Sequence, residues 1–406
     1  MLHKFSTLVV GCTIVLVLAG SLVTSTGSGL AVPDWPTTYG DNMFLFPPSK
    51  WVGGIFYEHG HRLIASTVGF LTIVLAAWLW IADPRRWMKR LGFAALGAVV
   101  LQGLLGGLTV LFFLPTAIST AHAGLAEIFF CLTVAIALFS SDGWNRGERE
   151  IDDARLRRLA TTTAALVYAQ ILVGATMRHS EAGLAIPDFP FMFGGLLPDH
   201  WDSKIAIHFA HRVGALVVAA SMLATCARVW FRHGTERTLT RPAQLLAVLV
   251  AVQVALGGMT VLSGRAVWIN SLHVVCGALV LATSLVLTLR SWRVKFATAS
   301  VGLTPEIVTF SGVRLKRDKV RLKPDTTTVD SAETVRLDTA TVRSVRLQAD
   351  LERTAPLQAD LERTAPLQGD LERTAPLQAD LERSVRLQAD HERGVRLRAN
   401  SNGVRP

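Results

Sequence analysis

The sequence predicts an all-α integral membrane protein, with eight transmembrane helices in two tandem four-helix bundles (a parallel internal repeat) and a disordered C-terminal tail. Three observations support this: long apolar runs, an internal repeat, and an abrupt change of composition near residue 297. Half of the 406 residues are apolar, and they are concentrated before residue 295. Crossing a bilayer takes about 20 apolar residues. No run alternates as the strands of a membrane barrel do, so the spans are expected to be helices.

Eight apolar runs are long enough to be membrane helices. They lie at about residues 7–25, 62–82, 92–114, 118–140, 158–177, 208–231, 243–262 and 267–289. The first resembles a signal peptide because Lys4 precedes its apolar core. It continues directly into a repeated motif, however, so we interpret it as an uncleaved first helix.

The net charge of +10 is distributed as in a membrane protein, which argues against nucleic acid as a partner. Basic residues gather in alternate loops, where their excess marks the cytoplasmic side. We therefore expect a bacterial-type inner membrane protein with both termini in the cytoplasm. The basic loops contain Arg85, Arg86, Lys89, Arg90, Arg146, Arg149, Arg155, Arg157, Arg158, Arg228, Arg232, Arg237 and Arg241, whereas the other loops contain only Lys50, Arg178, Lys204 and Arg265.

The internal repeat can be read directly from the sequence. The segment 29–36, GLAVPDWP, matches 183–190, GLAIPDFP, and Gln102 followed by Gly-Gly-x-Thr-Val matches the segment that begins at Gln253. Each copy holds four spans, an even number, so both copies have the same orientation in the membrane. This divides the chain into an N-terminal half, 1–145, a C-terminal half, 146–296, and a tail, 297–406. Within the tail, residues 341–396 repeat with a period of ten, and no aromatic residue follows Phe310, so we expect the tail to be disordered.

Four histidines occupy duplicated positions in this repeat. They are His61 and His122 in the first half and His211 and His273 in the second. Each opens an apolar run on the predicted outer side, and an ionisable residue inside a membrane span is a functional candidate by default. Imidazole is a good axial ligand of heme iron, and two helices of a bundle can present one imidazole each across its core. The pattern therefore predicts two bis-histidine heme sites.

Zinc is a poorer fit, because a zinc site needs three or four ligands and each half has only two duplicated histidines. The cysteines do not supply the missing ligands, because all four lie in predicted spans without a metal-binding spacing; they are Cys12, Cys131, Cys226 and Cys276. His59, His179, His200 and His208 have no consistent counterpart in the other copy.

Charged residues flank the histidines. Arg62 and Arg212 each follow a signature histidine and are expected to contact heme propionates. Glu58 precedes His61 by one helical turn, whereas the matching position in the second half is His208. A carboxylate there can act as a base or stabilise positive charge. Only the first site is therefore expected to perform chemistry.

With these motifs, residues 5–292 resemble the heme A synthase family. The resemblance rests on the segment 27–36, on Glu58-x-x-His61-Arg62, on His122, on His208-x-x-His211-Arg212 and on His273. It implies an eight-helix enzyme that oxidises a porphyrin methyl group of heme O to a formyl group, giving heme A for terminal oxidases.

The resemblance also implies the site roles and the partners. His211 and His273 would bind a heme B cofactor, and His61 and His122 would hold the substrate heme O with Glu58 catalytic. Its partners would be heme O synthase and oxidase assembly proteins, in addition to the lipid bilayer. The oligomeric state stays open, and a homo-oligomer is one of the alternatives. Some members carry a cysteine pair in the first outer loop, but residues 25–57 contain none here, which puts a thiol-dependent mechanism in doubt.

Two alternatives remain at this stage. A di-heme b-type electron-transfer cytochrome would place its hemes at different depths, commonly with two ligands on one helix, whereas here each helix gives one histidine on the same side. A heme transporter or chaperone would need the histidines but not Glu58.

Overall fold

The computed structural model describes residues 1–145 and 152–301, and its regular elements there are all helices. Eight of them are long and apolar enough to cross a membrane. The prediction of an all-helical chain with eight candidate spans is confirmed. The long helices are α1 (Leu2–Ser25), α2 (Gly54–Ala82), α3 (Arg86–Leu111), α4 (Thr116–Phe139), α6 (Ala154–His179), α7 (Ser203–His233), α8 (Arg237–Leu262) and α9 (Val267–Val301).

Three short elements accompany the long helices. Two 3-10 turns, Met43–Leu45 and Pro48–Lys50, lie in the segment between α1 and α2. The short helix α5 (Asp142–Asn145) follows α4. The expected tail begins near the end of α9, and residues 302–406 lie outside the described residues.

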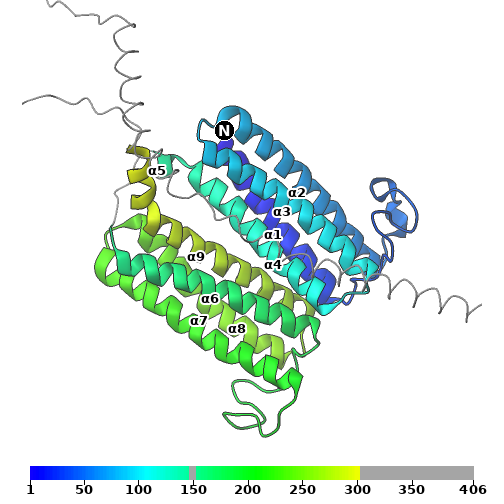
Figure 1. The fold of residues 1–406 in the computed structure, drawn as a ribbon. Helices are drawn as coiled ribbons and strands as arrows, with labels where there is room; N and C mark the ends of the chain where they lie inside the picture. Colours follow the sequence, from blue (N-terminus) through cyan, green and yellow to red (C-terminus); the bar gives the residue numbers. More distant parts are fainter. Residues whose placement is uncertain (146–151, 302–406) are drawn as a thin grey trace, which may run out of the picture. The chain divides into compact units, whose positions relative to one another are not determined.

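The long helices form two groups of four (Figure 1). In the first group α1 packs against α2 and α4, and α3 also packs against α2 and α4. In the second group α6 and α8 make the same contacts with α7 and α9. Each group is therefore a square in which α2 lies diagonally across from α4, and α7 diagonally across from α9.

The two groups meet through equivalent helices. The helix α1 packs against α9, and α6, which holds the matching place in the second group, packs against α4. Polar contacts join the groups at the end of α1, where Ser25 Oγ accepts from Arg178 at 2.8 Å, from Asn270 at 3.1 Å and from Ser271 at 2.9 Å. The equivalence of the two helix pairs, α1 with α9 and α6 with α4, is what a duplicated chain would produce.

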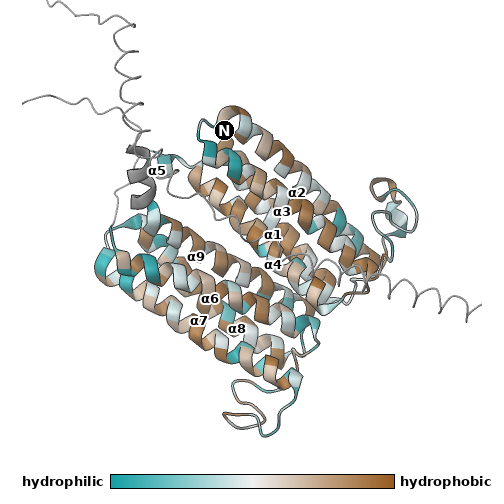
Figure 2. Ribbon diagram, in the orientation of Figure 1, coloured by the Kyte–Doolittle hydropathy of each residue, from teal (hydrophilic) through white to brown (hydrophobic). Residues whose placement is uncertain are grey.

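Each group has its own apolar core. In the first, side chains such as Leu75, Leu79 and Phe129 are buried together, and in the second Leu156, Met222 and Leu246 are. Apolar residues also cover the outer surfaces of the helices, as Figure 2 shows along their lengths. A soluble bundle would carry a polar outer face, so helices apolar on both faces fit a lipid environment.

Two of the helices that carry signature histidines, α2 and α7, begin earlier than the apolar runs indicated. The helix α2 begins at Gly54 and α7 at Ser203, whereas the runs begin near residues 62 and 208. Hydropathy marks only the apolar part of a helix, and the first two turns of α2 and α7 contain polar residues such as Glu58 and His208. The histidines therefore lie about two turns inside their helices rather than opening them.

Candidate functional site

The four signature histidines lie at one end of the helices, in the first nine residues of α2, α4, α7 and α9. His61 is on α2 and His122 on the diagonally opposite α4, and the two rings are close enough for a charge on one to act on the other. The same holds for His211 on α7 and His273 on α9. Each four-helix group thus brings two imidazoles together from opposite corners of its square.

A glycine on a neighbouring helix lies against each imidazole ring. A Cβ atom built on Gly20 would be 3.0 Å from Cε1 of His61, and one on Gly174 would be 2.9 Å from Cε1 of His211. The corresponding distances are 3.2 Å from Gly106 to His122 and 3.1 Å from Gly257 to His273. All four are shorter than ordinary van der Waals contact.

These glycines explain a feature that the sequence left ambiguous. From the sequence alone, glycine at positions 106 and 257 is compatible with close helix packing or with space for a flat macrocycle. The structure shows instead that its immediate role is to let the imidazole ring approach the neighbouring backbone.

The ring nitrogens test whether the two sites fit a heme group. Nδ1 of His61, of His122 and of His273 is buried without a hydrogen-bond partner in the described part of the chain. Buried polar atoms are normally satisfied, and those left unpaired call for an explanation. The residues themselves are only partly buried. Four neutral imidazoles, paired across two bundle cores, are a donor set that fits heme iron.

No cluster within the described residues suits a bare metal ion, because no group of three or more His, Cys, Asp or Glu side chains is placed to hold one. The four cysteines are free thiols. The two histidines of each half therefore match a ligand that supplies its other donors itself, as a porphyrin does.

Glutamine side chains contact two of the histidines. Gln102 on α3 donates to the carbonyl oxygen of His122 at 3.0 Å, with its amide nitrogen 3.3 Å from the ring Nε2. Gln170 on α6 donates to the carbonyl oxygen of His211 at 2.7 Å and lies 2.9 Å from Nδ1 of that ring. The sequence does not mark Gln170 as a site residue, because its counterpart in the other half is not a glutamine.

Arg62 and Arg212 anchor the loop that precedes their own helix. Arg62 donates to the carbonyl oxygens of Val32 at 2.8 Å and Asp34 at 2.8 Å, and of Thr37 at 3.1 Å. Arg212 donates to the equivalent carbonyl oxygens in the second half, those of Ile186, Asp188 and Phe191. The two arginines therefore hold the Pro-Asp-aromatic-Pro segments over the helix ends.

The aspartates of these segments form the same turn twice. Asp34 accepts from the backbone N–H of Tyr39 and Gly40, and Asp188 from those of Phe193 and Gly194. Although partial burial of Asp34 opposes its charged form, the bonds from the loop lower its pKa. The bond from Gly194 is the first cause of the lowered pKa of Asp188. Both turns are thus stabilised around a carboxylate.

The aromatic residue of each segment packs against a second glycine. A Cβ atom on Gly107 would be 2.5 Å from the Trp35 ring, and one on Gly258 would be 2.8 Å from the Phe189 ring. The repeated Gly-Gly pairs on α3 and α8 therefore have two functions: the first glycine accommodates a histidine and the second an aromatic side chain of the covering loop.

Glu58 and His208 occupy the same place but differ in charge. Glu58 Oε2 accepts from the Val32 N–H at 2.8 Å, and Nδ1 of His208 accepts from the equivalent Ile186 N–H at 3.2 Å. Both side chains are buried. Glu58 also pairs with Arg62 at 2.6 Å. Either residue can fasten the loop, so the carboxylate of the first half adds a charge that loop anchoring does not require.

Two histidines without a counterpart in the other half, His59 and His179, have structural contacts. His59 is buried, contacts Thr38 Oγ1 at 3.2 Å and packs against Phe46 and Trp51, so it belongs to the packing of the loop. His179, also without a counterpart, ends α6 and accepts from Thr116 through its carbonyl oxygen.

Arg178, which the sequence pattern placed in a loop with few basic residues, lies within α6. Its guanidinium donates to the Ser21 carbonyl oxygen at 2.8 Å, across the interface between the two groups of helices.

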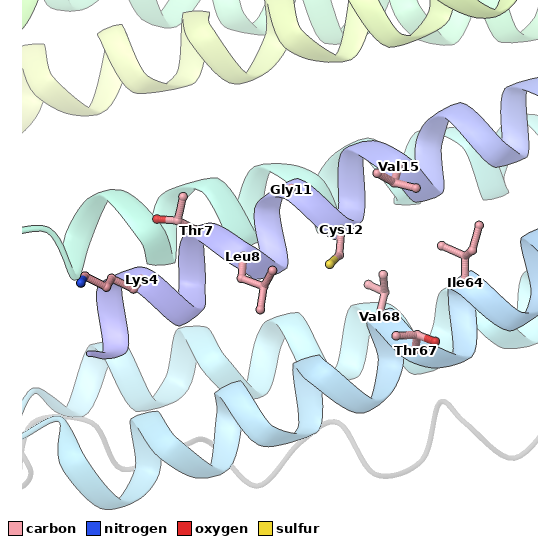
Figure 3. Close-up of a pocket in the computed structure, with 9 residues that line it drawn as sticks. All are labelled: Lys4, Thr7, Leu8, Gly11, Cys12, Val15, Ile64, Thr67 and Val68. Atoms are coloured by element: carbon pink, nitrogen blue, oxygen red, sulfur yellow. The ribbon is translucent and has the colours of Figure 1, made fainter.

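A groove of about 640 Å³ runs between α1 and α2 and does not contain the histidines (Figure 3). It reaches Ile64, which is one helical turn beyond His61. Its lining is mainly apolar and consists of Lys4, Thr7, Leu8, Gly11, Cys12, Val15, Ile64, Thr67 and Val68.

Comparison with known proteins identifies relatives over most of the helical region. Residues 3–285 match the family model COX15-CtaA, described as cytochrome oxidase assembly protein. A heme A synthase from Alkalihalophilus pseudofirmus is 30% identical over 267 residues, which are 65% of this chain and 88% of the relative. One from Halalkalibacterium halodurans is 28% identical over 287 residues, 70% of this chain and 94% of the relative. With its eight apolar helices and duplicated histidine pairs, the chain belongs to the COX15-CtaA family of multi-pass membrane proteins, the heme A synthase family of cytochrome oxidase assembly proteins.

Proposed function

We propose that this protein oxidises the porphyrin methyl group of heme O to the formyl group of heme A. The observation that supports this most directly is the pairing of two bis-histidine sites with a buried carboxylate in only one of them. The product supplies terminal oxidases, in keeping with the assembly role of the family. Heme O synthase and oxidase assembly proteins are the partners that this reaction requires.

The two halves, 1–145 and 146–296, are tandem copies of one four-helix bundle related by an axis along the membrane normal. The equivalent contacts of α1 with α9 and of α6 with α4 support this relation. So do the matched glycine–histidine contacts in both halves. An even number of spans in each half gives both the same orientation. With the basic loops in the cytoplasm, both histidine sites face the outer side of the cell membrane.

The second half holds heme B, with His211 and His273 as axial ligands. The first half holds the substrate, with His61 and His122 as ligands of heme O. Glu58 supports this order, because only the first half has a carboxylate at the site. Heme B would supply one-electron redox chemistry when bound.

Glu58 is the catalytic residue of the first half. Oxidation of a methyl to a formyl group removes hydrogen, so a base next to the substrate has protons to accept. Its carboxylate is held by the Val32 N–H and the Arg62 guanidinium, which fix its position. A negative charge so fixed can also stabilise positive charge that develops on the substrate.

Arg62 and Arg212 are the proposed propionate contacts. In the described part of the chain their terminal amino groups bind loop carbonyl oxygens, so a propionate would share each guanidinium with the loop. The loop and its aromatic residue, Trp35 or Phe189, would cover the site and exclude water. A dry site strengthens the electrostatic effect of the charged groups within it.

The test is to express the full chain together with a heme O synthase, to extract the hemes and to separate them by chromatography. Heme A is expected from the wild-type protein, whereas Glu58→Ala is expected to retain heme B and accumulate heme O. His208→Ala, at the matching position, is the control and is expected to keep heme A production. If wild-type protein that contains heme B yields only heme O, the synthase proposal is wrong.

The same experiment separates the enzyme from the transporter and the cytochrome, because neither of these forms heme A. The positions of the histidines already argue against a transmembrane electron wire. All four lie within the first nine residues of their helices, at the same end of the described helices, rather than at two depths.

A further inference from the structure

The groove between α1 and α2 begins beside the first histidine site. Ile64 lines it and lies three residues, about one helical turn, after His61 on α2. On α1 the lining extends from Val15 back to Lys4, which is roughly 16 Å at about 1.5 Å per residue. Val15 is the end nearer to Gly20, whose position contacts the His61 ring. The groove therefore leads from the histidine site toward the opposite end of the bundle.

The lining of the groove suits an apolar chain. Cys12 on α1 points toward Val68 on α2, and these two side chains form the floor (Figure 3). Leu8 and Val15 form the rim, and each is 53% exposed. Among the described residues that line the groove only Lys4 is charged, and it lies at the end away from His61. An apolar chain would thus find contacts along the groove, with no charged group near the histidine.

The groove has the size of a ligand site and is open on one side. Its volume of about 640 Å³ is within the range of small-molecule pockets, about 300–1,000 Å³. A Cβ atom built on Gly11 would meet no atom within 4 Å, so the lining leaves space over this stretch of α1. The half-exposed rim lies on the apolar outer surface of the helices. A chain can therefore enter the groove sideways from the bilayer.

The duplicated second half shows whether such a groove is a general feature of this bundle. Gly20 contacts His61 and Gly174 contacts His211, and these equivalent contacts set the register between α1 and α6. The two histidines set the register between α2 and α7. Each residue of the groove can therefore be compared with its counterpart in the second half.

The floor of the groove has smaller residues in the first half. Gly11 corresponds to Ala165, and Cys12 corresponds to Leu166. The Leu166 side chain is larger than the thiol of Cys12, and it raises the floor at the middle of the matching surface.

The rim differs in the opposite direction. Leu8 corresponds to Thr162 and Val15 to Ala169, so the first half has the larger residues on its rim. Higher walls and a lower floor make the groove of the first half the deeper of the two.

The second half is also filled at the end near its histidine. Gly214 stands at the position of Ile64, but the Gln170 side chain lies against it, because a Cβ atom on Gly214 would be 2.2 Å from Oε1 of Gln170. The absence of a side chain on α7 therefore leaves no channel there.

We propose that the groove between α1 and α2 binds the isoprenoid chain of heme O. Heme O carries this long apolar chain where heme B has a vinyl group, so only the half that takes heme O needs a channel for it. A chain held in the groove would fix the rotation of the porphyrin about its iron axis, and so select the methyl group that is presented to Glu58. This inference rests on the proposed function, because that function assigns heme O to the first half.

The first test fills the groove without disturbing the core. Gly11→Leu places a side chain over the floor, and its Cβ atom clashes with nothing. Gly97→Leu makes the same change at an exposed glycine of α3 that also has no neighbour within 4 Å, and it serves as the control. Full-length protein that contains heme B only in the second half is placed in lipid nanodiscs. Heme O or heme B is then titrated into the first half, and binding is followed by visible absorbance.

The wild type and Gly97→Leu are expected to bind heme O at least about 10-fold more tightly than heme B, a preference equivalent to about 1.4 kcal/mol. Gly11→Leu is expected to bind the two hemes equally, because the chain no longer has its channel. A wild type without preference for heme O would overturn the proposal, and so would a Gly11→Leu protein that keeps the preference.

The second test locates the chain directly in the wild-type protein, and it does not depend on the folding of any variant. A heme O analogue with a diazirine at the end of its isoprenoid chain is bound and irradiated, and the labelled peptides are identified by mass spectrometry. Labels are expected on α1 between Lys4 and Val15 or on α2 between Ile64 and Val68. Labels confined to bilayer lipid or to other helices would show that the groove does not hold the chain.

Failure of the proposed function would look different from failure of this inference. In the first case the wild-type protein would make no heme A, whatever the groove binds. In the second case the wild type would make heme A, but the binding preference and the labelled positions would not depend on the groove.

Discussion

Replacement of Gly174 by alanine offers a sharp test of the site geometry. The built Cβ atom lies 2.9 Å from Cε1 of His211 and 3.3 Å from Nδ1. Ordinary contact begins at 3.4 Å, so the ring has to move by about half an ångström. Functional constellations tolerate displacements of about 0.5 Å at most. The methyl group is therefore expected to displace the imidazole from its position for iron binding.

The magnitude follows from the cost of overpacking. Inserting a methyl group into a packed interior costs about 1–3 kcal/mol. If that cost appears only when the ring must hold iron, heme affinity falls by about 5- to 150-fold, since about 1.4 kcal/mol corresponds to a factor of ten. Alanine also has a helix propensity about 1 kcal/mol better than glycine, so the helix itself is not expected to be destabilised.

The assay is the amount of heme B per protein and the visible spectrum after purification. Gly103→Ala is the control, because a Cβ atom there has no neighbour within 4 Å. That variant gains the helix propensity without a clash and is expected to keep its heme. If Gly174→Ala protein contains as much heme as Gly103→Ala protein, and holds it as firmly, the glycine contact does not position His211 and our reasoning is refuted.

Three other predictions concern the first site and the opposite end of the bundle. Glu58→Gln keeps the acceptor for the loop N–H but removes the charge. It is expected to retain the fold and heme B while lowering heme A yield about 100-fold or more, the lower end of general-base effects. An equal heme A yield in the extracted hemes would show that the charge is not part of the mechanism. Gly107→Ala is expected to displace Trp35, because the Trp35 ring would lie 2.5 Å from the new Cβ atom. Acrylamide should then quench tryptophan fluorescence more strongly than in the wild type. Unchanged quenching would show that the loop does not pack on α3. Asp153 lies outside the spans, and its carboxylate is 3.0 Å from the guanidinium of Arg228. Burial opposes the charged form of Asp153, but the Arg228 guanidinium holds the pKa of this carboxyl well below its usual range. A lowered folded-state pKa gives stability that is present above the unfolded pKa, near 4, and is lost as the pH falls below it. Asp153→Asn is therefore expected to lower the free energy of unfolding by about 1.5–3 kcal/mol at pH 7 and to flatten the acid-side dependence of the melting temperature; an unaltered slope between pH 5 and pH 3 would contradict it.

The histidine pattern shows how far local signals extend. His61, His122, His211 and His273 stood out because a duplicated ionisable residue in an apolar run is rare and costly. The sequence also indicated which half differs, through Glu58. It did not indicate the helix starts near Gly54 and Ser203, because hydropathy detects apolar surface rather than the hydrogen-bonded turns before it.

Other parts of the site left no such signal. Gln170 looks like an ordinary polar residue in a helix, and only the structure shows that its amide contacts His211. The charge of Arg62 and Arg212 predicted contacts with heme propionates. The structure shows that both donate hydrogen bonds to loop carbonyl oxygens, which a sequence cannot reveal. Contacts between residues distant in the chain depend on how the helices are placed around one another.

The sequence by itself determined the helical class, the number of spans, the duplication and the identity of the paired histidines, because hydropathy and repetition are properties of the chain. The tertiary structure decided that α2 faces α4 and α7 faces α9 across two squares, since diagonal placement is a consequence of packing. It also decided which glycine accommodates which ring and that Glu58 and His208 perform the same anchoring task with different charge. Those relations depend on differences of a few tenths of an ångström in the contacts between different helices, and close packing fixes them only when the whole bundle is assembled.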